Sequence, residues 1–309
     1  MLKKKDLLGL YDTSAEEIDE ILREAEGMRK FLDGKNKKSD LLSGKSLITL
    51  FYENSTRTRT SFELAGKYLG ASEVNISSSA SSVQKGETLI DTGETLDSLK
   101  TDFIVIRHPM AGAPKLLASR VKASVLNGGD GMNEHPTQAL LDMLALKRRF
   151  KKIEGLKVAI LGDIKHSRVA KSNLFGLTKL GAQVYMYAPA TLLPKEIEKL
   201  GAKVCKSREE AIEGADGVMG LRIQLERQNG GLFPSLSEYS KYYGVNDELL
   251  KYAKKDAIVL HPGPVNRGVE LSPSVIDGEK SVILEQVTCG LAVRMALLKL
   301  LAEYREAEL

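Results

Sequence analysis

Short runs of β-branched and apolar residues alternate with amphipathic stretches along almost the whole chain. Such runs occur at 158–161, 184–187 and 218–221, and a segment with helical spacing of apolar residues separates each from the next. Strands that alternate with helices are typical of βαβ units, in which parallel strands form a sheet and helices cover its faces. The pattern therefore predicts an α/β fold.

The length of 309 residues exceeds what one hydrophobic core usually supports, which predicts two domains. A helix expected at about 136–150 begins with a proline and links them. The apolar stretch 284–304 is expected to form a long helix that packs back on the first domain. We predict two doubly wound parallel-sheet domains, with residues 1–136 and the C-terminal helix at about 286–309 in the first and residues 137–285 in the second.

The individual elements follow from the same pattern. In the first domain we expect strands at 46–52, 103–106 and about 123–126, and a helix at about 56–69 closed by Gly70. In the second domain we expect strands at 158–161, 184–187, around 204, 218–221 and 257–260. Thr13 and Glu16 have the spacing of a capping box at the start of the first helix.

Composition and charge exclude several classes of protein. The chain is 42% hydrophobic and 28% charged. No apolar run approaches the roughly 20 residues that cross a bilayer. The N-terminal segment has no apolar stretch like that of a secretory signal, so we expect a cytoplasmic protein that does not bind membranes. The net charge of +4 is spread along the chain, which does not favour nucleic-acid binding.

The cysteine content predicts neither a disulfide framework nor a metal centre. Cys205 and Cys289 lie far apart in the sequence, and neither has Cys or His neighbours at metal-ligand spacing. We therefore expect buried thiols and no zinc site.

A cluster of hydroxyl and guanidinium groups follows the first predicted strand, where ligands bind in open α/β sheets. Ser55, Thr56, Arg57 and Thr58 open the next helix. Free N–H groups, the positive end of the helix dipole and the arginine suit a phosphate. The alternative is that Ser55 or Thr56 simply caps the helix. Capping does not explain Arg57 and Arg59 in a first turn where the dipole disfavours cations, so we favour an anion site.

Two histidines are also candidate site residues, one after a predicted strand and one at the start of the linking helix. Arg107 and His108 come after the strand 103–106, and His135 and Gln138 lie at the start of the linking helix. A lone histidine is more often structural than catalytic, and this interpretation is kept for His108. His135 begins a helix, where the dipole favours a neutral imidazole that can donate to a substrate carbonyl oxygen.

The second domain places arginines after two strands. Arg168 follows the strand 158–161, and Arg222 and Gln224 follow the strand 218–221. The intervening Gly162 loop lacks the G-x-G-x-x-G spacing, so a nicotinamide cofactor is not favoured. Arg168 and Arg222 can instead hold two carboxylates of one small substrate, with solvated surface arginines as the alternative.

Two further loops carry candidate groups. The prolines of the segment 261–264 fix the backbone and remove N–H donors, so the carbonyls of Gly263 and Pro264 can accept hydrogen bonds from an amide-like ligand. A rigid turn is the alternative, and both can hold. The polar segment 77–86 ends with Lys85 before a predicted helix, and is either functional or a mobile surface loop.

These motifs, in this order, resemble the carbamoyltransferase family over essentially the whole chain. The resemblance is carried by Ser55-Thr56-Arg57-Thr58-Arg59, Arg107-His108-Pro109, His135-Pro136-Thr137-Gln138 and His261-Pro262-x-Pro264. Ornithine-using members carry His-Cys-Leu-Pro in the last loop, so this chain is more similar to the aspartate-using branch. Ser81, Lys85 and the segment 86–88 resemble the mobile loop of that branch, although Gln84 stands where some members have a second lysine.

The resemblance implies transfer of the carbamoyl group from carbamoyl phosphate to the amino group of L-aspartate, an early step of de novo pyrimidine biosynthesis, without metal or organic cofactor. It implies a carbamoyl phosphate-binding first domain, an aspartate-binding second domain, and a homotrimer in which Ser81 and Lys85 enter a neighbouring subunit's site. Regulatory chains or other pyrimidine-pathway enzymes are partners that such chains can have.

The resemblance also assigns roles residue by residue. It implies that carbamoyl phosphate is bound by Ser55, Thr56, Arg57, Thr58, Arg107, His135, Gln138, Gly263 and Pro264. It implies that L-aspartate is bound by Lys85, Arg168, Arg222 and Gln224, and that Arg57, Thr58, Lys85, Arg107 and His135 are catalytic.

Three alternatives stay open at this point. A carbamoyltransferase for another amino acid, such as ornithine, is disfavoured because Arg168 and Arg222 do not suit a diamino substrate. A phosphate-binding homologue without catalysis has no need of the intact catalytic residues. A nicotinamide-dependent dehydrogenase is the most distant alternative.

Overall fold

The computed structural model describes residues 2–77, 86–224 and 235–308. The chain forms two compact units, one of Met1–Leu144 with Thr288–Leu309 and one of Ala145–Val287. It passes into the second unit within helix α5 (Pro136–Phe150) and returns within helix α11 (Ile283–Ala307). The predicted boundary after residue 136 lies at the start of that same α5 helix.

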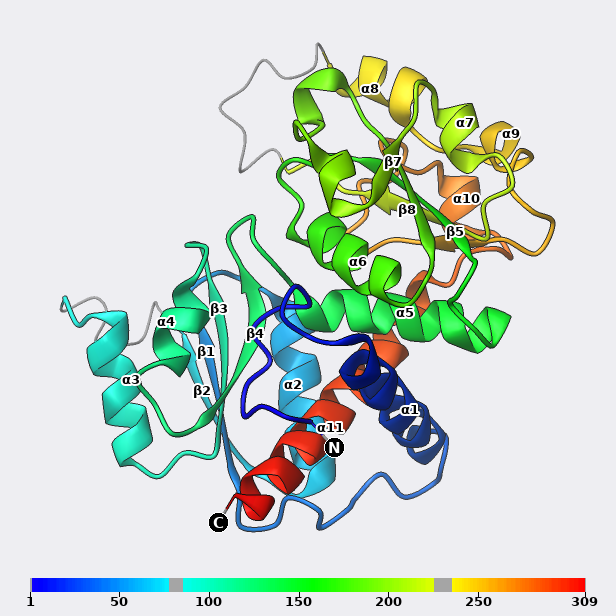
Figure 1. Cartoon of the computed structure of the whole chain (residues 1–309). Coiled ribbons are helices and arrows are strands. Elements are labelled where there is room, and N and C mark those ends of the chain that lie inside the picture. The colour runs from blue at the N-terminus through cyan, green and yellow to red at the C-terminus, as the bar shows by residue number, and fades with distance from the viewer. Residues whose placement is uncertain (1, 78–85, 225–234, 309) are drawn as a thin grey trace. The chain divides into compact units, whose positions relative to one another are not determined.

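The first unit contains a four-stranded parallel sheet of β1 (Ser46–Phe51), β2 (Ser72–Ser77), β3 (Phe103–His108) and β4 (Ser124–Asp130), in the order β2-β1-β3-β4. Its other helices are α1 (Ala15–Leu32), α2 (Thr56–Leu69), α3 (Leu89–Ser98) and α4 (Ala113–Ala118). Figure 1 shows α3 and α4 on one side of this sheet and α2 on the other. Every residue of β4 is buried, as expected for a parallel strand covered on both faces.

The second unit contains a five-stranded parallel sheet in the order β7-β6-β5-β8-β9. The strands are β5 (Lys157–Gly162), β6 (Gln183–Tyr187), β7 (Ala202–Val204), β8 (Gly217–Leu221) and β9 (Ile258–Leu260). The helices of this unit, seen in the upper part of Figure 1, are α6 (Arg168–Lys179), α7 (Arg208–Ile212), α8 (Leu236–Tyr243), α9 (Asp247–Leu250) and α10 (Pro273–Asp277), with 3₁₀ turns at Ala190–Leu192 and Ile197–Leu200.

Each sheet reverses its winding direction between two neighbouring strands. The reversal lies between β1 and β3 in the first unit, and between β5 and β8 in the second. The predicted fold class, with two doubly wound parallel sheets, is therefore confirmed. In such sheets ligands bind outside the carboxyl ends of the strands at the reversal, so a site is expected at that edge of each sheet.

The C-terminal helix packs in the first unit, as predicted. Lys299 of α11 donates a hydrogen bond to Glu24 of α1 at 2.8 Å. The Arg294 guanidinium, also on α11, lies 5.1 Å from the Phe62 ring of α2 and donates to Thr137 Oγ1 at 3.4 Å. Burial lowers the pKa of Arg294 to about 10.

Several sequence-based assignments need correction. The first capping box is formed by Ser14 and Glu17, whereas Thr13 donates its hydroxyl hydrogen to the Gly9 carbonyl oxygen at 2.6 Å. The prediction was therefore wrong by one residue. Strand β4 runs on to Asp130, beyond the predicted end at residue 126. Strand β2 and helix α4 were not predicted.

Both cysteines are buried free thiols, as predicted. Burial raises the pKa of the Cys205 thiol to about 11. Within the described residues, every helix is too short or too polar to cross a bilayer.

Candidate active site

The segment 55–59, rich in hydroxyl and guanidinium groups, lies at the reversal point of the first sheet. Strand β1 ends at Phe51, which pairs in register with Arg107 of β3, so the loop after β1 and the Arg107 side chain share one edge. Ser55 is the N-cap residue of α2, yet its side chain makes no capping hydrogen bond. The first turn of α2 contains no acidic residue, Arg57 is exposed and Thr58 is buried. Simple capping by Ser55 therefore does not account for the motif.

The Arg107 guanidinium is held from two directions. Its Nε lies 3.3 Å from Glu53 Oε2 in the loop after β1, and its Nη1 donates to the Gly128 carbonyl oxygen in β4 at 3.2 Å. These contacts fix a positive charge beside the start of α2. Such a fixed fork of donors suits an anionic or carbonyl oxygen.

His135 stands immediately before α5 and is 5% exposed. Its carbonyl oxygen accepts hydrogen bonds from the N–H groups of Gln138 and Ala139, at 3.1 and 3.3 Å. The side-chain amide of Gln138 donates from Nε2 to Asp142 Oδ1 at 2.9 Å. The oxygen of the same amide, Oε1, can therefore act as an acceptor. An NH2 group is a suitable donor to that oxygen.

The residue before His135 is Glu134, whose buried carboxylate was not predicted as part of the site. Its contacts hold the backbone at this point. Glu134 is 4% exposed and accepts hydrogen bonds from the N–H groups of Leu10 and Tyr11, at 2.7 and 3.1 Å. Its own N–H donates to Asp130 Oδ1 at 3.0 Å. The N-terminal segment and the end of β4 therefore hold the backbone that carries His135.

His108 has a structural environment. Its Nδ1 accepts a hydrogen bond from the Met110 N–H at 3.0 Å, and its ring packs edge-on against Tyr52 with centroids 4.7 Å apart. Burial lowers the pKa of His108 and so favours the neutral ring. The structural interpretation of His108 explains these contacts.

The arginines of the second unit flank its reversal point. Arg168 is the first residue of α6 and is buried, and Arg222 directly follows β8. Gly162 at the end of β5 pairs in register with Leu221, which brings the two following loops to the same edge of the sheet. Arg222 Nη2 donates to Gln224 Oε1 at 3.2 Å.

Asp163, which the sequence analysis did not single out, joins these two loops. The carboxylate is fully buried, and its Oδ2 accepts a hydrogen bond from the Gln224 N–H at 3.2 Å. Its Oδ1 lies 2.8 Å from His166 Nδ1 and accepts from the His166 N–H at 3.2 Å. Its position directly after a strand was the signal that it belongs with the site residues.

The loop after β9 presents a compact two-proline turn. Gly263 has a φ of +64°, and the Gly263–Pro264 peptide bond is cis. The Gly263 N–H donates to His261 Nδ1 at 2.9 Å, and the His261 N–H donates to Gln286 Oε1 at 3.0 Å. His261 and Glu270 are both buried, with His261 Nε2 3.1 Å from Glu270 Oε1. The backbone that carries the Gly263 and Pro264 carbonyls is therefore held by buried side chains.

Tyr239 of α8 is buried near carboxylates from two of these loops. Burial raises the pKa of its hydroxyl, and the charges of Glu270 and Asp163 raise this pKa further. The phenol therefore stays protonated and can act as a hydrogen-bond donor at neutral pH.

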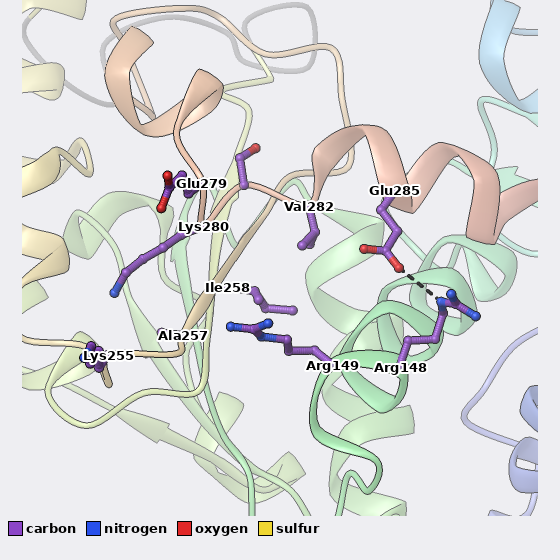
Figure 2. A pocket seen from close by; sticks show the side chains of 10 residues that line it. Arg148, Arg149, Lys255, Ala257, Ile258, Glu279, Lys280, Val282 and Glu285 are labelled. Atoms are coloured by element: carbon purple, nitrogen blue, oxygen red, sulfur yellow. Dashed lines mark hydrogen bonds and ion pairs between the residues drawn. The ribbon is translucent and has the colours of Figure 1, made fainter.

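A cavity of about 500 Å³ in the second unit contains none of the predicted site residues (Figure 2). It lies where β9 begins, whereas the 261–264 loop follows the other end of that strand. Arg148 and Arg149, in the last turn of α5, line it, and Arg148 Nε lies 3.1 Å from Glu285 Oε1. Basic residues in a last turn complement the helix dipole, so the positive charge of this cavity has a structural explanation.

Two predicted site residues, Ser81 and Lys85, lie outside the described residues, as does Gln84. Over residues 2–77, 86–224 and 235–308 no three His, Cys, Asp or Glu side chains gather into a group that can hold a metal ion.

Comparison with known proteins decides the family. Residues 5–148 match the family described as aspartate/ornithine carbamoyltransferase, carbamoyl-P binding domain. Residues 154–301 match its Asp/Orn binding domain. The chain belongs to the aspartate/ornithine carbamoyltransferase family. The resemblance found in the sequence motifs is thereby confirmed.

Relatives in the aspartate/ornithine carbamoyltransferase family match almost the full chain. The aspartate carbamoyltransferase catalytic subunit of Ruminiclostridium cellulolyticum is 67% identical over 97% of this chain and 96% of its own length. Aspartate transcarbamoylase from Trypanosoma cruzi, solved with carbamoyl phosphate, is 33% identical with a TM-score of 0.86 and covers 96% of both chains. Ornithine carbamoyltransferase from Pyrococcus furiosus is 31% identical with a TM-score of 0.85 and covers 95% of both chains. The fold alone therefore does not distinguish the two substrates.

Proposed function

We propose that this protein transfers the carbamoyl group of carbamoyl phosphate to the amino group of L-aspartate, giving N-carbamoyl-L-aspartate and phosphate. The observation that carries the proposal is the set of side chains that lie at the reversal points of the two sheets. The first sheet has the hydroxyl and arginine cluster of the α2 start there, and the second has Arg168 and Arg222. A phosphate and a dicarboxylate are the ligands that such groups suit. The 67% identity to an aspartate carbamoyltransferase catalytic subunit supports aspartate over ornithine.

The proposed mechanism begins with the binding and activation of carbamoyl phosphate. Ser55, Thr56 and Arg57 hold the phosphate, and Arg57 stabilises its charge as it leaves. Thr58, Arg107 and His135 donate toward the carbonyl oxygen, in the manner of an oxyanion hole. Gln138 and the carbonyl oxygens of Gly263 and Pro264 accept from the carbamoyl NH2 group.

The second unit binds and orients the acceptor in this mechanism. Arg168 and Arg222 bind the two carboxylates of L-aspartate, and Gln224 supports Arg222. The amino nitrogen then attacks the carbamoyl carbon, the bond from that carbon to the phosphate oxygen breaks, and the departing phosphate takes up the proton that the nitrogen loses. Positioning and charge stabilisation together supply the catalysis, and no covalent enzyme intermediate is required.

We also propose the assembly and setting that the family resemblance implies. The active form is a homotrimer in which Ser81 and Lys85 of one subunit complete the site of its neighbour. The reaction serves pyrimidine biosynthesis in the cytoplasm, where regulatory chains or other enzymes of that pathway are candidate partners.

The test is a direct assay of the acceptor. Purified protein is mixed with carbamoyl phosphate and either L-aspartate or L-ornithine, and ureido product and released phosphate are both measured. We expect product with L-aspartate alone. Product with L-ornithine would overturn the roles of Arg168 and Arg222, and no product with either would favour the homologue without catalysis.

A further inference from the structure

His261 is held in a single neutral tautomer by its neighbours. A backbone N–H can only donate, so the hydrogen bond from the Gly263 N–H makes His261 Nδ1 an acceptor. The proton of the neutral ring is then on Nε2, which lies 3.1 Å from Glu270 Oε1 and donates to it. The imidazole therefore links the Glu270 carboxylate to the backbone of Gly263.

The same Glu270 oxygen also holds the far side of the two-proline turn. Oε1 accepts a hydrogen bond from the Asn266 N–H at 2.6 Å. One carboxylate oxygen thus anchors the chain before Pro262, through His261, and after Pro264, through Asn266. The carbonyl oxygens of Gly263 and Pro264 lie between these two anchors.

Glu270 is itself fixed by its surroundings. Its side chain is 2% exposed, so solvent does not compete for these hydrogen bonds. Its backbone carbonyl oxygen accepts from the Val245 N–H at 3.0 Å, and Leu271 forms a parallel bridge with Val245. The backbone at Glu270 is therefore fixed, which makes this buried side chain a stable reference point for the turn.

We propose that Glu270, acting through His261 and Asn266, is a positioning residue that makes the site select carbamoyl phosphate over acyl phosphates without an NH2 group. The proposal rests on the proposed function, in which the Gly263 and Pro264 carbonyls accept from the carbamoyl NH2. A hydrogen bond weakens steeply when its angle departs from linearity, so the direction of these carbonyls determines what the NH2 group gains. A methyl group at the same position gains nothing from their direction.

The experiment compares two ligands that differ at this one group. Acetyl phosphate has a methyl group where carbamoyl phosphate has NH2. The dissociation constants of both, and of inorganic phosphate, are measured by titration calorimetry at low temperature for the wild-type protein and for Glu270→Ala, Glu270→Gln and Glu279→Ala. Glu279 is an exposed carboxylate of the same unit and lines the cavity of Figure 2, so its variant is the matched control.

We expect Glu270→Ala to weaken carbamoyl phosphate binding by roughly tenfold, with acetyl phosphate and phosphate within about twofold of wild type. Glu270→Gln should restore most of the preference, because its amide oxygen accepts the same two hydrogen bonds, and Glu279→Ala should match wild type. If Glu270→Ala does not fold, His261→Asn gives the same test, because its side chain is too short to reach Glu270. Equal weakening of all three ligands, or an unchanged preference in a folded variant, would overturn the proposal.

Failure of the proposed function gives a different result. In that case the wild-type protein itself makes no ureido product and shows no preference between the two acyl phosphates, whatever the variants do.

Discussion

The guanidinium groups of the candidate site are held to different degrees, and this difference follows their proposed tasks. Arg107 is fixed by Glu53 and the Gly128 carbonyl, and Arg168 is buried at the start of α6. Arg57 is exposed in the first turn of α2, where the helix dipole opposes a cation. A positive charge in that unfavourable place is expected to serve a ligand rather than the fold.

Arg57→Ala should therefore remove catalysis while leaving the fold intact. We expect turnover to fall by at least about a hundredfold, on the scale of deleting one donor that stabilises the transition state. Arg59→Ala is the control, because it removes the same charge from the same turn. Arg59 Nε lies 3.8 Å from Glu63 Oε1, and Arg59 has no role in the proposed mechanism. Steady-state turnover of both variants is the measurement, and near-normal turnover of Arg57→Ala would rule out its proposed role.

The site residues that sequence motifs predicted are those next to strand ends, where chain position alone is informative. Glu134 and Glu270 were not predicted, because their roles depend on partners that sequence patterns do not show, and Asp163 was not singled out although it directly follows a strand. Glu134 accepts from N–H groups near residue 10, and Asp163 accepts from the Gln224 N–H. Sequence spacing carries no record of such long-range pairings.

At the level of elements, β2 shows why one strand was missed. Its sequence, SEVNIS, includes polar residues, and it lies at the edge of the sheet, paired with β1 alone. Val74 is exposed, so the apolar pattern of a buried strand is absent. The apolar runs within β1, β3 and β4 were predicted because burial on both faces favours such runs, whereas the polar end of β4 at 127–130 was not.

Glu73 in this edge strand predicts a pH-dependent stability. Its side chain lies over Gly66 of α2, and burial, with a smaller contribution from Glu63, raises its pKa to about 7. A carboxyl pKa raised in the folded state means that stability falls as pH rises from the unfolded value of 4.5 to about 7. Glu73→Gln should therefore raise the melting temperature at pH 8 and change it little at pH 4.5. An equal effect at both pH values would contradict this account.

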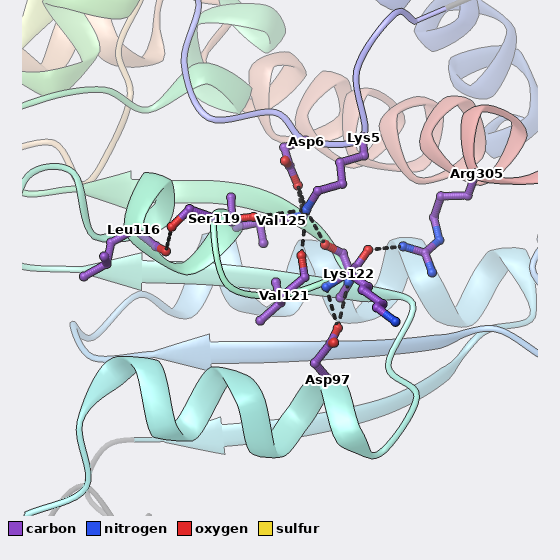
Figure 3. A network of polar contacts seen from close by, with 11 residues as sticks. Lys5, Asp6, Asp97, Leu116, Ser119, Val121, Lys122, Val125 and Arg305 are labelled. Atoms are coloured by element: carbon purple, nitrogen blue, oxygen red, sulfur yellow. Dashed lines mark hydrogen bonds and ion pairs between the residues drawn. The ribbon is translucent and has the colours of Figure 1, made fainter. Parts of the chain in front are cut away.

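The N-terminal segment is held to the sheet by a network of polar contacts (Figure 3). Lys5 Nζ donates to the carbonyl oxygens of Ala118, Val121 and Ala123 at 3.0 to 3.2 Å. The neighbouring Asp6 accepts from the Val125 N–H at 2.8 Å, and burial raises its pKa. One lysine thus satisfies three carbonyls of the connection between α4 and β4.

Lys5→Met should lower stability without touching the proposed chemistry. We expect a loss of about 1–3 kcal/mol in the free energy of unfolding, because three carbonyl oxygens lose a charged donor. Lys37→Met, at an exposed position, is the control. Denaturant titration of both variants is the measurement, and equal stability of the two would show that the Lys5 contacts contribute nothing measurable.

At the scale of the whole molecule, the alternation of strand and helix was enough to predict two doubly wound sheets. The order of the strands was not predicted, because parallel strands with similar apolar runs can pair in several orders. The position of each reversal point depends on that order, and the structure supplies it. The sequence therefore predicted which residues follow strands. It did not predict that these residues form two clusters, one at the reversal point of each sheet.

The proposed shared site predicts complementation between inactive chains. Arg57→Ala and Lys85→Ala are each expected to abolish most activity. Mixing the two under conditions that exchange subunits should restore part of it, because some hybrid trimers contain a site with both residues intact. Mass spectrometry can confirm that hybrids form, and no recovery in confirmed hybrids would argue against a shared site.

The central claim is that the arginines of both units bind one pair of substrates. N-(phosphonacetyl)-L-aspartic acid, the compound in one of the Trypanosoma cruzi aspartate transcarbamoylase structures, carries a phosphonate and an aspartate in one molecule. Its affinity is measured by titration calorimetry for wild type, Arg57→Ala, Arg222→Ala and the control Arg149→Ala. We predict one molecule per chain, with binding weakened at least about tenfold by each of the first two changes and unaffected by the control. A loss of affinity in only one of the two variants would contradict the account.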